Sequence, residues 1–265
     1  MLLDGLMRNA WLLALVAAVA VWEAAAPRHR RVAGRSVRWP TSFTLGPMNA
    51  VVATVPLAPL ALATALAQRG GVLAIDIALG SWLAIPLGVL LLDLAFYVQH
   101  RVLHAVPMLW SVHRVHHSDV DLDYTTAFRF HPIEACVTNV TALACIGFFG
   151  VPALAVVVHQ TLAVSFTILE HTNARVPAVI ESWAGRVVVT PSMHRIHHSA
   201  AARNTDSNFA TIFSLWDRWL GTYTPPAAAE RDDLEIGLRE FRQTKYLTLP
   251  WTLALPFLPN RHAQQ

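Results

Sequence analysis

Long apolar stretches, separated by short polar turns, constrain this chain more than any other feature of its sequence. They cover residues 6–26, 48–67, 72–97, 133–150, 152–169 and 247–258. The fourth and fifth would each form about 27 Å of helix, close to the ~30 Å of a bilayer's hydrocarbon core. Only 14% of the residues are charged, against about 25% in soluble domains, so lipid must cover part of the surface. We expect an all-α, multi-pass membrane protein with about four to five apolar helices or half-hairpins.

A run of arginines directly follows the first apolar stretch and predicts the orientation of the chain. Its members are Arg28, Arg30, Arg31, Arg35 and Arg38. Basic loops beside spans face the cytoplasm, and counting spans from this loop places every dense histidine cluster on the cytoplasmic side. Nucleic-acid sites interleave basic and aromatic residues on a polar surface, so we expect no nucleic-acid partner.

The first apolar stretch can be interpreted as a secretory signal peptide or as a retained span. Residues 6–26 have no marked basic n-region and no clear small-residue cleavage site. We therefore expect a retained span in the cell inner membrane.

We expect the chain to have three parts. Residues 1–84 carry the N-terminal spans, and residues 85–225 carry the later spans and a histidine-rich helical cap. Residues 226–265 form a tail that we expect to lie along the membrane interface, because prolines break its apolar stretch. Cys136 and Cys145 lie inside an apolar segment, where we expect buried small side chains and not a disulfide or a metal site.

Eight of the thirteen histidines fall into three dense clusters. The clusters are His100 and His104; His113, His116 and His117; and His194, His197 and His198. Positions i, i+3 and i+4 share one face of a helix, so the imidazole rings of each cluster are expected to lie on one face. Neutral imidazole is the commonest metal ligand and suits Zn, Cu, Fe and Ni. Because one ion takes about four to six donors, eight or more histidines predict two ions.

The remaining histidines are assigned by their positions. His171 follows the hairpin of residues 133–169 at the membrane level of the clusters, so we expect it to bind metal. His131 begins the hairpin and is either a ligand or a capping residue. The others, which we expect to be interfacial bystanders, are His29, His159 and His262.

Residues around the clusters predict their local structure and their partners. Pro107 precedes the second cluster, and Thr190 with Pro191 predicts an N-cap and a first helical position before the third. Ligating imidazoles usually donate their other N–H to a carboxylate or carbonyl. Asp93 and Tyr97 share a helical stripe with His100 and could orient it. Weaker candidates, with a solvated helix end as the default interpretation, are Asp119, Glu134, Glu170, Asp206 and Asp217.

These residues resemble the fatty acid hydroxylase / sterol desaturase superfamily over about residues 85–225. The matching segments are residues 93–104, 109–118, 129–132, 171–173, 194–199, 205–209, 216–218 and 221–223. The resemblance implies an integral membrane, non-haem di-iron enzyme that uses O₂ to oxidise an unactivated C–H bond of a lipid. It also implies a separate electron donor, such as a ferredoxin- or cytochrome b5-like protein with its reductase.

One departure from the family pattern affects the ligand count. Some members carry H-x-x-x-H in the region of His171, whereas Thr167 stands at the first position here. That ligand is either missing or supplied by another residue, such as His131 or, through water, Asn173.

The hypothesis is therefore a lipid oxidoreductase whose two iron ions are held by the eight cluster histidines and His171. It hydroxylates or desaturates a sterol-like, fatty acyl or other lipid, with hydroxylation favoured. One alternative is a di-zinc membrane hydrolase, although such sites usually mix carboxylates with histidine. The other is a metal transporter, although transport sites lie near the bilayer midplane and these histidines are expected past the ends of the spans.

Overall fold

The computed structural model describes residues 10–52, 71–225 and 234–259, which form helices and loops with two isolated bridges and no strand. The predicted all-α class is therefore confirmed for these residues. Most of the predicted span over residues 48–67 lies outside them, as does His262.

The longer helices are α2 (Ala10–Ala25), α3 (Arg35–Val52), α6 (Ser81–Ala105), α7 (Pro107–His117), α8 (Pro132–Phe149) and α9 (Ala153–Glu170). The shorter ones are α5 (Ile75–Leu79), η1 (Tyr124–Phe128), α10 (Ala178–Ala184), α11 (Pro191–His197), α12 (Ala202–Thr205), α13 (Leu215–Trp219), η3 (Thr244–Leu247), α14 (Leu249–Ala254) and η4 (Leu255–Phe257).

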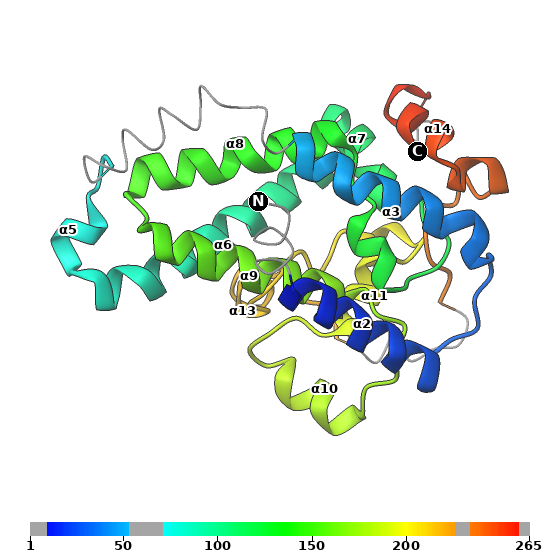
Figure 1. The fold of residues 1–265 in the computed structure, drawn as a ribbon, viewed down its shortest axis with the longest axis horizontal. Coiled ribbons are helices and arrows are strands. Elements are labelled where there is room, and N and C mark those ends of the chain that lie inside the picture. Colours follow the sequence, from blue (N-terminus) through cyan, green and yellow to red (C-terminus); the bar gives the residue numbers. More distant parts are fainter. Residues whose placement is uncertain (1–9, 53–70, 226–233, 260–265) are drawn as a thin grey trace.

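Three helices of the described residues, α6, α8 and α9, are long and apolar enough to cross a membrane. Helix α6 packs against both α8 and α9 (Figure 1). Gly150 ends α8 in the left-handed conformation, and Pro152 precedes the first turn of α9, so the two helices form a tight hairpin. Gly88 lets α6 approach α9 closely, because a Cβ there would lie 2.9 Å from the Cβ of Ala155. The helices α8 and α9 match the predicted hairpin.

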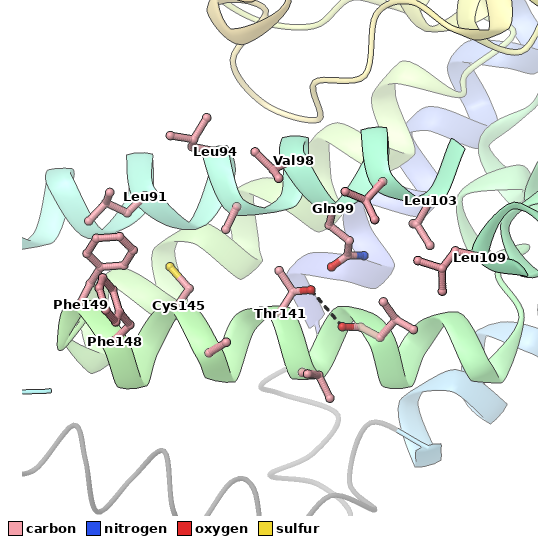
Figure 2. A pocket seen from close by; sticks show the side chains of 15 residues that line it. Leu91, Leu94, Val98, Gln99, Leu103, Leu109, Thr141, Cys145, Phe148 and Phe149 are labelled. Atoms are coloured by element: carbon pink, nitrogen blue, oxygen red, sulfur yellow. Dashed lines mark hydrogen bonds between the residues drawn. The ribbon is translucent and has the colours of Figure 1, made fainter. Parts of the chain in front are cut away.

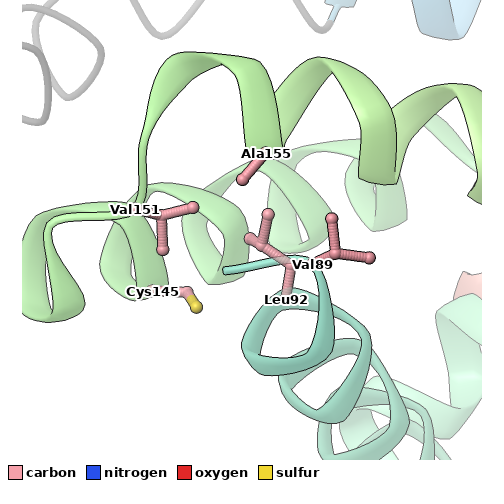
Figure 3. Packing of buried hydrophobic residues seen from close by; sticks show 5 residues of the cluster. All are labelled: Val89, Leu92, Cys145, Val151 and Ala155. Atoms are coloured by element: carbon pink, nitrogen blue, oxygen red, sulfur yellow. The ribbon is translucent and has the colours of Figure 1, made fainter. Parts of the chain in front are cut away.

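Apolar side chains join these three helices near the hairpin turn (Figure 3). Val89 and Leu92 of α6 pack with Cys145 of α8, with Val151 of the turn and with Ala155 of α9. The outward faces of the helices carry exposed large apolar side chains. An apolar helix that leaves such a face uncovered by protein is typical of a membrane span.

The two cysteines differ in their surroundings. Cys145 is buried, as predicted, whereas Cys136 is exposed on α8, and neither forms a disulfide. The prediction for Cys136 is wrong because an apolar position on a spanning helix can face lipid as well as protein.

The spanning helix α6 differs from the predicted span over residues 72–97. It continues until Val106, which adopts an extended conformation before Pro107. His100 and His104 consequently lie in the last turns of the spanning helix. The sequence analysis had wrongly placed them past its end. The helix continues because no proline or glycine lies between Tyr97 and Val106, so the change from apolar to polar residues does not end it.

Helix α2 is an apolar helix of 16 residues within the predicted span over residues 6–26, whose first four residues lie outside the described ones. Its Glu23 is buried and accepts hydrogen bonds from the backbone N–H groups of Tyr124 and Asn173. Arg31 donates to the second carboxylate oxygen at 3.2 Å. These bonds attach α2 to η1 and to the loop after α9, so the helix is an integral part of the fold.

The arginine run packs against the segments that carry histidines. Arg28 Nη1 donates to Ser192 Oγ at 2.6 Å, beside the third histidine cluster. Arg38 is fully buried and donates to Asp119 at 2.5 Å and to Asp123 at 2.7 Å. Although burial alone would raise the pKa of Asp119, the Arg38 guanidinium holds it below its usual value.

The apolar stretch near the C-terminus packs against the rest of the protein, and its position along the membrane interface stays a prediction. Its α14 contacts α3, and its η4 contacts α7. The buried Arg114 of α7 donates to the carbonyl oxygens of Leu255 and Leu258. The sequence showed an apolar stretch broken by prolines. It did not show that carbonyl groups of this stretch accept hydrogen bonds from a buried guanidinium.

We predict that Arg38→Met destabilises the protein by about 3–5 kcal/mol, because Asp119 and Asp123 would remain buried without their cation. Thermal unfolding in detergent and the amount of protein accumulating in membranes would measure the effect. Arg30→Met is the matched control, since Arg30 is exposed, and should change stability by less than ~0.5 kcal/mol. Equal unfolding temperatures for the two variants would contradict this assignment.

Candidate metal centre

Nine histidines converge where α6, α7, α9 and α11 meet, and they form two groups. In each group one nitrogen from every ring lies within 4.8 Å of the others. The α6 group contains His100, His104, His113, His117 and His197. The α9 group contains His116, His171, His194 and His198. The structure thus brings together all eight cluster histidines and His171.

Neighbouring histidines of the same motif face different groups. His117 belongs to the α6 group and His116 to the α9 group. In the third cluster, His197 belongs to the α6 group and His198 to the α9 group. The sequence predicted one common face for each H-x-x-H-H motif. In the structure the first and last histidines, four residues apart, share a group, and the middle one faces the other group. Adjacent helical residues differ by about 100° in direction, so the motif can serve two sites at once.

The local starts of the two motif helices follow the sequence signals. Pro107 is the first residue of α7, and Pro191 is the first residue of α11, with Thr190 at the N-cap position. The Thr190 hydroxyl makes no capping bond, and within the described residues it is buried without a hydrogen-bond partner. The proline, with its preset φ, therefore accounts for the helix start better than side-chain capping does.

Outward hydrogen bonds from Nδ1 fix three of the rings. The pairs are His100 with the Phe209 carbonyl, His171 with the Thr167 carbonyl and His197 with the Ser207 carbonyl, at 2.6–2.8 Å. A carbonyl oxygen only accepts, so each of these rings carries its proton on Nδ1. The opposite nitrogen, Nε2, then has a bare lone pair directed into its group.

Glu134 fixes a fourth ring. Its buried carboxylate lies in the first turn of α8 and accepts a hydrogen bond from His113 Nδ1 at 2.7 Å. Carboxylate–histidine pairs of this kind orient metal ligands and raise their basicity. The sequence analysis had taken Glu134 by default as a solvated residue at a helix end, and that interpretation was wrong. Its sequence signal was an acidic residue at the head of an apolar helix, three positions after His131.

In the α6 group the inward lone pairs meet at short range. His100 Nε2 lies 3.0 Å from His113 Nε2, although both rings carry their proton on Nδ1. No proton lies between these two nitrogens, so their contact is repulsive unless a cation joins them. Two imidazole nitrogens bound at a right angle to one ion, at about 2.1 Å each, would be about 3.0 Å apart. The spacing fits a shared metal ion.

In the α9 group, too, imidazole nitrogens lie close together, and here more rings take part. His171 Nε2 lies 3.0–3.2 Å from the Nε2 atoms of three other rings, those of His116, His194 and His198. Because the His171 proton is on Nδ1, its Nε2 can accept at most one good hydrogen bond along its lone pair. A metal ion within the group would satisfy all four lone pairs together.

Burial keeps the rings neutral, which is the form that binds metal. Burial first, and neighbouring imidazoles second, hold the pKa well below its ordinary value in His116, His117, His194 and His198. Burial also lowers the pKa of His171 to about 4 and that of His197 to about 3. At neutral pH these lone pairs are therefore available without release of a ring proton.

Asp93 and Tyr97, which the sequence suggested could orient His100, form hydrogen bonds with other residues. Asp93 accepts from Trp216 Nε1 at 2.7 Å, and the Tyr97 hydroxyl lies 2.8 Å from Thr222 Oγ1. Both residues share the predicted stripe on α6, but the loop of residues 205–223 packs against that stripe. They hold the loop that supplies the carbonyl partner of His100.

Asp217 holds the same loop from its other side. This fully buried carboxylate accepts from the backbone N–H groups of Phe209 at 2.8 Å and Ala210 at 3.0 Å. The Phe209 carbonyl in turn accepts from His100. Asp217 is therefore a positioning residue, and the default of a solvated helix end was wrong for it, as it was for Asp119.

Asp206 and Asn173, the two other predicted partners, take different positions. Asp206 Oδ1 lies 3.3 Å from His104 Nδ1, on a side chain that is 64% exposed. Asn173 instead exchanges hydrogen bonds with the backbone of His29. Asn173 thus holds the arginine-bearing loop in place. Of these two residues, only Asp206 contacts a ring of the centre.

His131 and His159 lie outside both groups. His131 Nδ1 accepts from the Ile133 N–H at the start of α8, in agreement with the capping alternative. His159 is buried in α9, stacks on Phe96 and has Nε2 4.0 Å from Asp93 Oδ1. The prediction that His159 is interfacial is wrong because its ring faces α6 at mid-helix.

Glu170 adds a carboxylate beside the α9 group. It is buried, and its Oε1 lies 3.7 Å from His194 Nε2 and 3.9 Å from His171 Nδ1. Its other oxygen is buried and has no hydrogen-bond partner among the described residues. The expectation that Glu170 is a solvated residue at a helix end was therefore wrong, and one buried carboxyl group borders the α9 group.

Comparison with known proteins gives a family match and several curated relatives. The family model described as fatty acid hydroxylase matches residues 85–222, slightly more than half of the chain. The alkylglycerol monooxygenase of Xenopus tropicalis is 31% identical over 158 residues, covering 60% of this chain and 33% of the relative. The ornithine lipid hydroxylase OlsE of Rhizobium tropici is 25% identical, covering 57% and 45%. Human cholesterol 25-hydroxylase is 28% identical, covering 50% and 48%.

The chain spans less than half the length of each of these three relatives. No solved structure matches it significantly. The similarity includes all three histidine clusters, because the matched residues 85–222 contain both groups.

We predict that His116→Ala and His117→Ala, although adjacent in α7, each remove metal from a different group. Bound metal should fall from about two ions per chain toward one in either variant, because the untouched group keeps its ligands. Elemental analysis of purified protein would measure this. His131→Ala is the control and should retain both ions. Full metal content in His116→Ala or His117→Ala, or loss of metal from a folded His131→Ala protein, would contradict the assignment.

Proposed function

Because this chain belongs to the fatty acid hydroxylase family, we propose that it is an O₂-dependent oxidoreductase that hydroxylates a lipid. The resemblance inferred from the histidine clusters is confirmed, and the family match covers nearly the predicted range. Support for a lipid substrate comes from the relatives, which are named for the oxidation of alkylglycerols, ornithine lipids and cholesterol. Their names also favour hydroxylation over desaturation.

One observation carries the proposal: the inward Nε2 lone pairs of His100 and His113, 3.0 Å apart with no proton between them. We propose that the α6 group and the α9 group each hold one iron ion. The donor set suits iron as well as other imidazole-binding metals, and the resemblance to di-iron enzymes supports iron. His131 is not included, because it caps α8.

Iron held in these groups would supply the activation of O₂ needed to break an unactivated C–H bond. Hydroxylation consumes one O₂, an electron pair and two protons, and it yields an alcohol and water. The electron pair must come from a separate carrier, which we propose to be a ferredoxin- or cytochrome b5-like protein with its reductase. Substrate and donor would reach the centre from the membrane and from the aqueous side, respectively.

The chain's own residues prepare the site before any substrate arrives. The carbonyl groups of Phe209, Thr167 and Ser207 and the carboxylate of Glu134 keep ring protons on the outward nitrogens. Seven of the nine histidines are at most 2% exposed, so the surrounding protein shields most of the centre from water. Exclusion of water protects a reactive oxidant from side reactions.

We also propose that the centre faces the cytoplasm. The contact of Arg28 with Ser192, and that of Arg38 with Asp119, place the arginine run on the same end of the spans as the histidines. Basic segments beside spans remain on the cytoplasmic side. A soluble electron donor in the cytoplasm could then reach the cap directly.

Cysteine labelling would test this orientation. In a protein whose Cys136 and Cys145 are replaced by alanine, Arg203→Cys marks the exposed cap and Ser81→Cys the opposite end of α6. A membrane-impermeant maleimide should label Ser81→Cys in intact spheroplasts. It should label Arg203→Cys only in inverted vesicles. The reverse pattern would contradict a cytoplasmic centre.

Comparative lipidomics of cells with and without the protein would test the reaction. We expect a lipid that gains one oxygen atom, with O₂ uptake by the purified iron-loaded protein in the presence of reductant. His197→Ala should accumulate in membranes but form no product, because it loses a ligand of the α6 group.

Other outcomes would overturn the proposal in distinguishable ways. Loss of two hydrogens without added oxygen would identify a desaturase. Hydrolysis by a zinc-loaded protein without O₂ uptake would identify a hydrolase. Metal accumulation in cells with unchanged lipids would identify a transporter.

A further inference from the structure

An apolar groove of about 580 Å³ lies between α6 and α8 (Figure 2). All of its lining side chains are apolar except Gln99 and Thr141. Its rim includes Val98, Val140 and Phe148, which are exposed on the outward faces of the spanning helices. The volume lies within the ~300–1,000 Å³ of typical small-molecule sites, and a groove that opens on these faces meets lipid.

The dimensions of the groove match a hydrocarbon chain. Its lining positions on α6 extend from Leu91 to Leu103, about 18 Å at 1.5 Å per residue. The acyl chains of one leaflet occupy about 15 Å, half of a ~30 Å hydrocarbon core. Phe148 and Phe149 lie at the Leu91 end, whereas Gln99 and Leu103 lie toward the other end (Figure 2). That end of α6 also carries His100 and His104.

Gln99 places one unpaired acceptor in this apolar lining. Its Nε2 donates to Thr138 Oγ1 at 2.9 Å, on the same face of α8 as Glu134 one turn earlier. The Thr141 hydroxyl donates to the Val137 carbonyl, so it is already engaged. No described residue donates to Gln99 Oε1, although this oxygen is buried. Buried acceptors are almost always paired, so an unpaired one at the wall of a groove indicates a missing donor.

We infer that the groove binds the hydrocarbon chain of a lipid whose polar end carries a hydroxyl or amide N–H, and that Gln99 Oε1 accepts its hydrogen bond. Because Gln99 directly precedes His100, the polar end of the lipid lies toward the α6 group. The methyl end lies toward Phe148 and Phe149. The groove thereby selects lipids by a hydrogen-bond donor as well as by length. That this lipid is the substrate rests on the proposed function.

Competition binding with two matched probes would test the inference on the metal-loaded, full-length protein in nanodiscs. The probes are 1-hexadecanol, which has a donor, and its methyl ether, which has none; radiolabelled 1-hexadecanol is the displaced ligand. The wild-type protein should prefer the alcohol by about fivefold or more, since an unmet buried acceptor is costly. Gln99→Met keeps the side-chain size and should abolish the preference. Gln160→Met is the matched control on the exposed face of α9 and should retain it.

A second variant separates loss of the groove from loss of the fold. Ala144 is exposed at the groove wall, so Ala144→Phe should fill part of the groove without disturbing the protein interior. We expect it to weaken binding of both probes while metal content stays at the wild-type level. Equal wild-type affinity for the two probes, a preference that survives Gln99→Met, or unchanged probe binding by Ala144→Phe would each overturn the inference.

The outcomes also separate this inference from the proposed function. Preferential alcohol binding by a protein that oxidises no lipid would support the groove and contradict the enzyme. Lipid oxidation by a protein that binds both probes equally would support the enzyme and contradict the groove.

Discussion

The structure depends on the direction in which imidazole protons point. Each outward Nδ1–H bond, such as that of His100 to Phe209 or of His113 to Glu134, leaves a bare lone pair facing inward. Several such lone pairs confined within a few ångströms repel one another. This arrangement is favourable only with a cation, so the hydrogen bonds around the centre prepare it to bind metal.

Buried charges outside the centre hold its supporting loops in place. Arg38 joins α3 to the segment after α7 through Asp119, and Glu23 joins α2 to the loop that follows His171. Asp217 fixes the loop that carries Phe209. Each of these groups would be costly to bury alone, but each is paired or accepts several backbone N–H bonds. The cap is therefore organised by polar contacts, whereas the spans are organised by apolar packing.

The spans of the hairpin and the nine converging histidines could be predicted from sequence because their signals are local. Apolar length predicted α8 and α9, and the spacing of the motifs predicted clustered rings. The division of His116 and His117 between two groups could not be predicted, because it depends on how α7 is rotated against its neighbours. The partners of Asp93 and Glu134 were also hidden, since they come from segments distant in the sequence. His159 was misplaced because a histidine in an apolar helix gives no sign of which face it occupies.

The division of adjacent histidines has a consequence for motion. Helix α7 supplies rings to both groups, and so does the segment of α11 that ends at His198. A hinge that displaced either helix would disturb both histidine groups together, so neither group could open independently of the other. The centre should therefore move as one rigid body. Any gating that admits a lipid or releases a product would have to occur in the spans or the outer loops, away from the helices that hold the rings.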